Sequence, residues 1–426
     1  MAVAAAGSLR IVVAVVLFAW LPTSLSACPA EWIKACPGEP CAPLKTPYPE
    51  REVMSFHADG PRESWRYYNW SIITTVITGH HETEDILSLV CEAHKHNVRI
   101  VYFGFSDSSD GHVALLHNST YRKEFIQQGI RDTVMNYPWI DGINIDLEHF
   151  SRNASTYDPE ALTSLVCDIQ RALHANGLRL HSQDMAPWGS YQSFNMTALA
   201  QCMDFVLPMG YCDPQSGSLA GPTVELDVLR NDFVNHRDNR SNPGRLIWTM
   251  PAEKIILGLP FFGYNFECIN AAPVPFPPVP VGGGPPPRCV INDTFPMTDH
   301  FVCVQLYHTE TVTSGPDIGF DPVKGSAWFE YKNSTTGKRH QVWFEDPRAV
   351  HAKAQFAFDT GIHGVAFWRG NEIYGVNNAS DREGADSADA RAMWQAAAPA
   401  NHRGGYGGRG FHSELGFRSE LKLDGH

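Results

Sequence analysis

Three polar side chains occupy alternate positions of one apolar stretch, and their types and spacing suit acid–base chemistry. Asn144, Asp146 and Glu148 alternate with isoleucine and leucine residues between positions 143 and 148. This period of two indicates a β-strand, in which residues two apart point to the same face. Two carboxylates placed so close repel each other when both are ionised, so we expect one pKa to rise. A carboxyl group that keeps its proton near neutral pH can act as a general acid.

The rest of the chain contains the elements needed to position such a strand. Strand-like patterns cover residues 52–57, 71–79, 98–106, 140–149, 178–187, 203–211, 254–266 and 363–370. Helical patterns lie between them, at residues 82–96, 122–136, 159–175, 196–201, 225–236 and 348–360, with a last one at 387–397. Eight strands alternating with helices predict an α/β fold, a parallel (β/α)8 TIM barrel. A doubly wound open sheet is the alternative, but no glycine-rich phosphate loop follows the first strand.

Composition divides the 426 residues into five segments. Residues 1–27 have Arg10, an apolar run and small residues, which is typical of a secretory signal peptide; a retained membrane anchor is the alternative. Residues 28–266 and 348–400 supply the first and last parts of the barrel. Residues 267–347 open with a Pro/Gly-rich stretch and show strand-like runs at 301–307 and 340–345, which predict an inserted α+β subdomain. The Gly- and Arg-rich residues 401–426 predict a disordered tail.

Charge and cysteine content narrow the classes of partner and compartment. The net charge of −13 argues against nucleic acid and anionic membranes as partners. Ten cysteines and eight Asn-x-Ser/Thr sites fit an oxidising secretory compartment and predict disulfides. Their connectivity does not follow from spacing, although Cys212 could pair with Cys202. The histidines and cysteines have no metal-ligand spacing, so we expect no metal and no cofactor.

The motif around Asn144 resembles that of family eighteen of the glycoside hydrolases, Asp-Gly-x-Asp-x-Asp-x-Glu on the fourth barrel strand. This chain has Asp141-Gly142-Ile143-Asn144-Ile145-Asp146-Leu147-Glu148. The resemblance also includes residues 69–76, 254–264, 340–344 and 364–368. The single departure is Asn144. In this position the chain resembles a lysosomal branch of the family, which also has asparagine there.

The resemblance implies retaining hydrolysis of β-1,4 bonds between N-acetylglucosamine units, with the substrate's own acetamido oxygen as the nucleophile. Glu148 would be the general acid and then the base, and Asp146 would orient the acetamido group and stabilise the oxazolinium intermediate. Asn144 would hydrogen-bond Asp146. Tyr211 would hydrogen-bond the attacking acetamido oxygen, and Met209 would line the pocket.

Trp368 is a further match to the family, and the remaining candidates match it less directly. Trp368 would form an apolar floor under the sugar. The family has Asp directly after the tyrosine, whereas this chain has Cys212 and then Asp213. Asp213 either reaches the site through a bulge or the contact is lost. Asp184, Trp188 and Phe56 end other strands, where barrel packing explains them at least as well.

The resemblance favours one substrate class and leaves alternatives. The expected reaction is cleavage of N,N′-diacetylchitobiose, the core left by the breakdown of asparagine-linked glycoproteins, in the lysosome. The partner would be a chito-oligosaccharide or N-glycan core, with no nucleic acid and no membrane, and the protein would be a monomer. A secreted chitinase or endo-N-acetylglucosaminidase is the first alternative. An inactive sugar-binding lectin is the second, but Glu148 argues against it.

Overall fold

A computed structural model of the protein describes residues 28, 30–58, 64–79, 84–106, 112–146, 158–178, 180–185, 194–211, 219–231, 233, 250–269, 288–291, 297–314, 317–373 and 388–398. The predicted signal peptide and the predicted C-terminal tail lie outside these residues. No helix in the described part of the chain is both long and apolar enough to cross a membrane.

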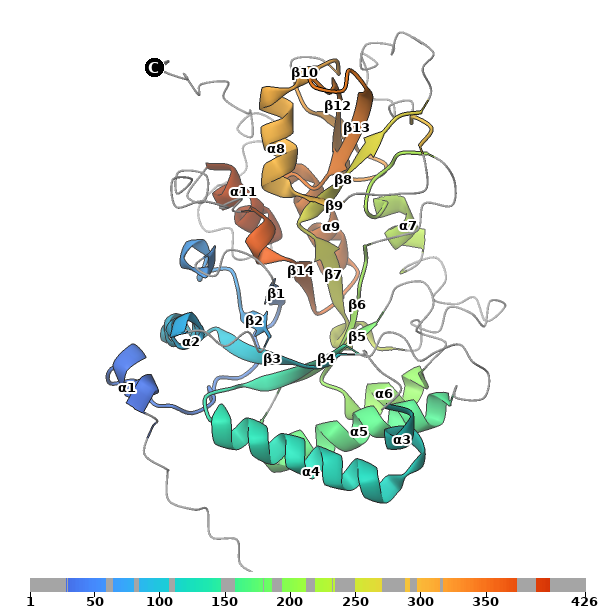
Figure 1. Ribbon diagram of the computed structural model, residues 1–426. Coiled ribbons are helices and arrows are strands. Elements are labelled where there is room, and N and C mark those ends of the chain that lie inside the picture. The colour runs from blue at the N-terminus through green and yellow to red at the C-terminus, as the bar shows by residue number, and fades with distance from the viewer. Residues whose placement is uncertain are drawn as a thin grey trace, which may run out of the picture.

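Eight parallel strands form the central sheet (Figure 1). They are β1 (Glu52–His57), β2 (Thr75–Thr78), β3 (Arg99–Ser106), β4 (Gly142–Asp146), β5 (Leu180–Met185), β6 (Phe205–Pro208), β7 (Ile256–Pro260) and β14 (Gly364–Trp368). The strand order is β6-β5-β4-β3-β2-β1-β14-β7. Parallel bridges from Val206 to Ile255 and from Met209 to Gly258 join the two edges. The sheet therefore closes on itself, and the predicted TIM barrel is confirmed.

The alternation of each strand separates the barrel interior from the helical layer. Ile143 and Ile145 of β4 are buried in the large cluster that includes residues of the surrounding helices. The barrel interior is filled by Met54, Phe56, Ile77, Val101, Phe205, Leu207, Ile256 and Ala366. Asn144 lies on the opposite face of β4 from the two isoleucines, and it is fully buried. The predicted apolar outer face and polar inner face of this strand are confirmed.

Ten helices and three short 3-10 turns are described around the two sheets. They are α1 (Ala30–Ala35), η1 (Ser64–Tyr67), α2 (Glu84–Lys95), α3 (His112–His117), α4 (Ser119–Asn136), α5 (Pro159–Ala175), α6 (Met196–Cys202), α7 (Leu226–Arg230), η5 (Ala252–Lys254), α8 (His300–Thr309), α9 (Pro347–Asp359), η6 (Gly370–Ile373) and α11 (Ala388–Ala397). Helix α5 begins at Pro159, and the side chain of Asp158 caps it by accepting a bond from the Ala161 amide at 2.9 Å. Proline at the first turn and aspartate before it are both favourable helix starts.

A second sheet of six strands lies between β7 and β14 in the chain (Figure 1). It contains β8 (Phe262–Glu267), β9 (Met297–Asp299), β10 (Thr311–Val312), β11 (Gly319–Asp321), β12 (Ser326–Lys332) and β13 (Arg339–Phe344). Its strands pair antiparallel, and α8 packs against it. The insertion of a small α+β unit after the seventh strand is confirmed, whereas the predicted segment boundaries stay a prediction.

Two local predictions in this region are wrong. The pattern at residues 254–266 is not one strand, because β7 belongs to the barrel and β8 to the second sheet. The strand-like run at 301–307 is part of helix α8. A continuous apolar run does not distinguish a strand from a buried helix by its periodicity. In α8, Cys303, Leu306 and Tyr307 reach the core of the second sheet, and this spacing of three and four is helical.

A buried ion pair joins helix α9 to the second sheet. Lys353 of α9 donates to Glu345, at the end of β13, and to the hydroxyl of Ser326 on β12 at 3.1 Å. Both charged side chains are at most 1% exposed. Burial lowers the pKa of Lys353 and raises the pKa of Glu345, while each partner's charge opposes that shift. Because either charge alone would be costly to bury, the pair ties the helix to the second sheet.

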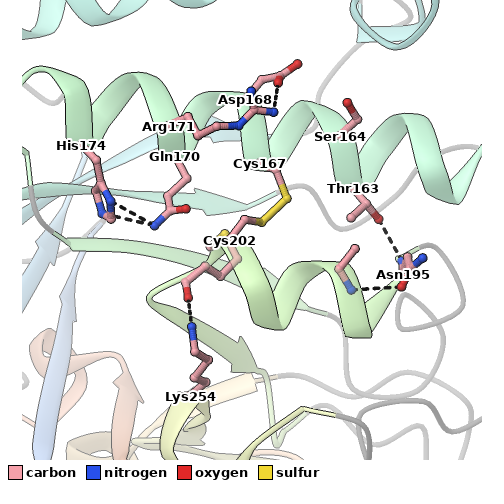
Figure 2. The surroundings of a disulfide bond; sticks show 12 residues. Thr163, Ser164, Cys167, Asp168, Gln170, Arg171, His174, Asn195, Cys202 and Lys254 are labelled. Atoms are coloured by element: carbon pink, nitrogen blue, oxygen red, sulfur yellow. Dashed lines mark hydrogen bonds and ion pairs between the residues drawn. A yellow bond between two sulfur atoms is a disulfide. The ribbon is translucent and has the colours of Figure 1, made fainter.

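Four disulfides are described, which confirms the prediction of disulfide bonding. They join Cys28 to Cys41, Cys36 to Cys91, Cys167 to Cys202 and Cys268 to Cys289. The suggested pairing of Cys202 with Cys212 is wrong, because Cys202 at the end of α6 is bonded to Cys167 of α5 (Figure 2). These two helices follow successive strands of the barrel, so their adjacency comes from the fold rather than from cysteine spacing.

Candidate functional site

The inner face of β4 carries the first candidate residues. Asn144 is fully buried, and Asp146, the last residue of the strand, is half-buried. Both belong to the end of the barrel where the strands terminate, which is where catalytic groups of this architecture are found. Glu148 lies outside the described residues, two positions beyond Asp146. Its predicted role as the acid therefore stays a prediction.

The amide of Asn144 is directed across to β5. Its Nδ2 donates to Ser182 Oγ at 2.9 Å and to Asp184 Oδ1 at 2.7 Å. The register of the two strands places Asn144 beside Ser182. An amide nitrogen has two hydrogens, so both are used by β5. The carbonyl oxygen of Asn144 is then the atom left for the predicted contact with Asp146, and that contact stays a prediction.

Asp184 is closer to the centre of the site than its sequence context suggested. Its side chain is 2% exposed, and it is in hydrogen-bond contact with a residue of the motif. The stretch Leu180–Met185 alternates poorly, since His181, Ser182, Gln183 and Asp184 are all polar. What distinguishes Asp184 is its hydrogen bond to Asn144 on the adjacent strand. This contact is known only once the pairing of the strands is known.

Met209 and Tyr211 follow β6, and the backbone there is tightly held. The amide of Met209 donates to Met185 O at 2.9 Å, and that of Gly210 donates to Gly258 O at 2.9 Å. A Cβ atom at Gly210 would lie 2.7 Å from Gly258 O, so glycine is required for this close approach. Tyr211 is 7% exposed, and its ring meets Phe262 edge-on at 5.9 Å between centroids. The segment therefore presents Tyr211 between the barrel and the second sheet.

Trp368 ends β14 and is half-buried. Its ring lies 5.2 Å from that of Phe56 on the neighbouring strand β1, measured between centroids. The peptide bond that follows it, to Arg369, is cis. A Cβ at Gly370 would lie 2.4 Å from Ser55 Oγ, so the chain after Trp368 also passes very close to β1. The half-buried indole of Trp368 thus packs on Phe56 of the barrel interior at this end of the barrel.

Met209 and Trp368 connect two apolar clusters. Both pack against the cluster inside the barrel and against the cluster of the second sheet, which contains Tyr211, Phe262 and Trp343. The candidates that lie on β6 and β14 therefore meet at the junction of the two sheets. An aromatic surface beside buried polar groups suits a sugar, because a pyranose has an apolar CH face and polar edges.

One motif residue lies away from this site, and several candidate residues are not among the residues that the structure describes. Asp141, the first residue of the motif, lies at the opposite end of β4. It accepts bonds from the Leu44 and Ile100 amides, each at 2.6 Å, and contacts His94 Nε2 at 3.0 Å. Asp213, Cys212 and Trp188 lie outside the described residues. In the part of the chain that the structure describes, no group of three or more His, Cys, Asp or Glu side chains could hold a metal ion.

Comparisons with known proteins agree with this architecture. A model of the glycosyl hydrolases family 18 matches residues 40–372. Di-N-acetylchitobiase of Rattus norvegicus is 27% identical over 368 residues, which cover 84% of this chain and 90% of that protein. Di-N-acetylchitobiase of Homo sapiens is 24% identical, over 79% of this chain and 82% of that protein.

Among solved structures, a group IV chitinase of Ostrinia furnacalis in complex with allosamidin superposes with a TM-score of 0.59 at 14% identity. The match covers 82% of this chain and 97% of that one. At this identity the likeness concerns the fold.

Proposed function

This chain belongs to family 18 of the glycosyl hydrolases, and from this premise we propose that it hydrolyses the β-1,4 bond of N,N′-diacetylchitobiose. The chitobiase relatives, aligned over most of the chain, support this substrate. The single observation that carries the proposal is the buried polar face of β4 at the same end of the barrel as the half-buried indole of Trp368. The first could serve acid–base chemistry and the second could bind a sugar ring.

Each candidate residue has a distinct task in the proposed reaction. Glu148 donates a proton to the leaving oxygen and later removes one from water. The substrate's acetamido oxygen attacks the anomeric carbon, so the protein supplies no nucleophile. Asp146 stabilises the positive oxazolinium that forms, and Tyr211 donates to the acetamido oxygen. Trp368 binds the apolar face of the sugar, and Met209 lines the pocket. Asp213 would make the substrate contact that the family makes with the aspartate after the tyrosine.

The four disulfides support a site of action within the secretory pathway or outside the cell. Within that range we propose the lysosome, where the chitobiose core of asparagine-linked glycoproteins would be the substrate. We also propose that the protein acts as a monomer. Immunolocalisation against a lysosomal marker and sedimentation of the purified protein test these two points.

Product analysis tests the proposed reaction. The purified protein is incubated with N,N′-diacetylchitobiose, with the N-acetylglucosamine tetramer and with cellobiose, and the products are separated over time. We expect cleavage of the dimer, early release of single N-acetylglucosamine units from the tetramer, and no cleavage of cellobiose, which lacks the acetamido group. Early release of dimer from the tetramer would favour the chitinase alternative. Cleavage of cellobiose would contradict substrate assistance.

A lectin is the second candidate function. Binding of the dimer without turnover by the wild-type protein would support it and would contradict the proposed hydrolysis. The intact carboxylate pair Asp146 and Glu148 favours the enzyme.

A further inference from the structure

At the end of the barrel where the strands terminate, two adjacent strands carry buried polar side chains. The cluster that fills the interior is apolar and receives residues from β1, β2, β3, β6, β7 and β14. Strands β4 and β5 contribute Asn144, Ser182 and Asp184 instead, and all three are at most 2% exposed. Burial of a carboxylate next to an apolar core is costly, so a residue such as Asp184 needs a compensating role.

The register of β4 and β5 defines where Asp184 lies. Asn144 is paired with Ser182 and Ile145 with Gln183, so Asp184 follows the last of these pairs on β5, as Asp146 follows it on β4. The Asn144 amide spans the two strands, since its Nδ2 donates to Asp184 Oδ1 at 2.7 Å. A carboxylate of β5 is thus hydrogen-bonded to the motif residue that lies two positions before Asp146 on β4.

We propose that Asp184 is a positioning residue of the active site, which holds the Asn144 amide toward β5 and adds a third carboxylate to the catalytic candidates Asp146 and Glu148. The commoner family motif has this third carboxylate on β4, at the position of Asn144. In this chain the carboxylate lies on β5, and an amide takes its place on β4. The inference rests on the proposed function and deepens it.

Two consequences follow from the hydrogen bond and the charge. With both amide hydrogens of Asn144 directed to β5, its Oδ1 is the atom turned away from Asp184, so the orientation of the amide depends on the Asp184 carboxylate. The negative charge also makes it harder for neighbouring carboxyl groups to lose their protons. It should therefore hold the proton of the acid Glu148 to higher pH.

Three of the described strands present groups near Asp184. Strand β4 presents Asn144 and Asp146, with Glu148 following, and β5 itself presents Ser182. Strand β6 presents the apolar Leu207 directly opposite Asp184, with Tyr211 further along. The titratable groups named here are therefore Asp146, Glu148 and Tyr211. The two carboxyl groups are expected to respond to the Asp184 charge at acidic pH.

Four variants separate charge from hydrogen bonding. Asp184→Asn is isosteric and keeps an oxygen that can accept from Asn144, but it removes the charge. Asn144→Asp adds a charge on β4, and the double variant N144D/D184N moves the charge from β5 to β4. Ser182→Ala is the matched control, because it removes the other acceptor of Asn144 without changing any charge. The pH dependence of kcat and kcat/KM is measured for each with N,N′-diacetylchitobiose.

For Asp184→Asn we expect kcat to fall roughly 10- to 100-fold with KM within about threefold, because positioning acts on the transition state. The alkaline limb of the pH profile should move down by about one pH unit, the scale of one nearby charge at an effective dielectric constant near 20. In the double variant this limb should return toward its wild-type position. In Asn144→Asp alone it should move up, and in Ser182→Ala it should not move.

The outcomes distinguish this inference from the function on which it rests. If the wild-type protein cleaves the dimer but Asp184→Asn keeps the wild-type alkaline limb and kcat, the role of Asp184 is wrong and the hydrolase stands. If the limb moves in Asp184→Asn but does not return in the double variant, the charge exchange between β4 and β5 is wrong. If the wild-type protein cleaves no N-acetylglucosamine substrate, the proposed function fails first, and the inference fails with it. Melting temperatures of all four variants show whether each is folded.

Discussion

The two ends of the same barrel bury carboxylates in different surroundings. At the end where the strands begin, Glu52 is fully buried, accepts from the hydroxyls of Thr74 and Thr75, and pairs with Arg99 Nη1 at 3.2 Å. The ring of Tyr48 lies 4.8 Å from the Arg99 guanidinium. At the end where the strands terminate, Asp184 shares the Asn144 amide with Ser182.

This difference explains why one end contributes stability and the other chemistry. Burial raises the pKa of Glu52, while the Arg99 charge and the two threonine hydroxyls lower it, so the charge of the pair is balanced within the protein. A carboxylate whose charge is compensated by a buried arginine interacts only weakly with a positive charge on a substrate. At the other end the Asn144 amide donates to the Asp184 carboxylate, and an oriented carboxylate suits a site where a cationic intermediate forms.

One motif spans both ends. Asp141 opens it and binds the Leu44 amide, so it holds the N-terminal segment against the base of the barrel. Asp146 lies five positions further on, at the other end of β4. The carboxylates of this motif therefore combine a structural residue with catalytic candidates, and strand position separates the two tasks.

The largest effect is expected from Glu148→Gln, which tests the end of the barrel proposed to carry the catalytic residues. Glutamine is isosteric but cannot donate the proton, so kcat should fall about 10²- to 10⁴-fold, the usual contribution of general acid catalysis. Stability and binding of the dimer should be close to wild type. Glu253→Gln, at an exposed carboxylate of η5 near the other end, is the control. Turnover by Glu148→Gln close to the wild-type value would remove Glu148 from its role.

Arg99→Met tests the structural end. It leaves Glu52 buried without its cation, so we expect a loss of about 3–5 kcal/mol in the free energy of unfolding at neutral pH. The loss should be smaller near pH 5, where Glu52 can take up a proton. Urea unfolding at the two pH values measures this, and kcat per folded molecule should change little.

Arg51→Met is the matched control at the same end. Arg51 donates to the backbone oxygen of Ile362 at 2.8 Å, so its loss leaves an acceptor rather than a buried carboxylate. It should cost clearly less than Arg99→Met. Equal losses in the two variants would mean that the charge of Glu52 is not what Arg99 compensates.

Asp146→Asn should lower kcat about 10²- to 10³-fold, with a smaller effect on KM. Its charge is needed when the oxazolinium forms, so the loss belongs to the transition state. Steady-state kinetics on N,N′-diacetylchitobiose measure the two constants separately. A loss confined to KM would contradict the electrostatic role and make Asp146 a binding residue.

The smallest effect concerns a third buried carboxylate, Glu330 of β12. Burial raises its pKa to about 7, opposed by the Arg339 charge and the Gln341 amide. The folded state then holds this proton more tightly than the unfolded state, whose ordinary value is 4.5. Stability from this group therefore grows as pH falls from about 7 toward 4.5, and it is lost as pH rises through 7.

Glu330→Gln removes that titration. The melting temperature of the wild-type protein should rise by about 2–4 °C more than that of the variant between pH 7.5 and pH 5. Glu267→Gln, at an exposed carboxylate of the same sheet, is the control. Equal changes in melting temperature with pH for the wild type and Glu330→Gln would show that Glu330 does not take up a proton in this range.

Much of the fold followed from local patterns, because each strand and helix carries its own period. The alternation at Ile143 and Ile145 defined which face of β4 packs against the helices, and eight strands alternating with helices defined the barrel. Asp158 and Pro159 marked the start of α5. Such signals depend on neighbours within about four positions along the chain, which is why the sequence alone contains them.

The pairing between distant segments was decided by the tertiary structure. The run at 301–307 became helix α8 because Cys303, Leu306 and Tyr307 meet the second sheet on one helical face. Cys202 pairs with Cys167 because α5 and α6 lie side by side around the barrel. Asp184 entered the site because closure of the sheet placed β5 beside β4 in one register. Contacts of this kind join residues that are dozens of positions apart in the chain. The spacing of apolar residues within one strand or helix does not indicate which other element will lie next to it.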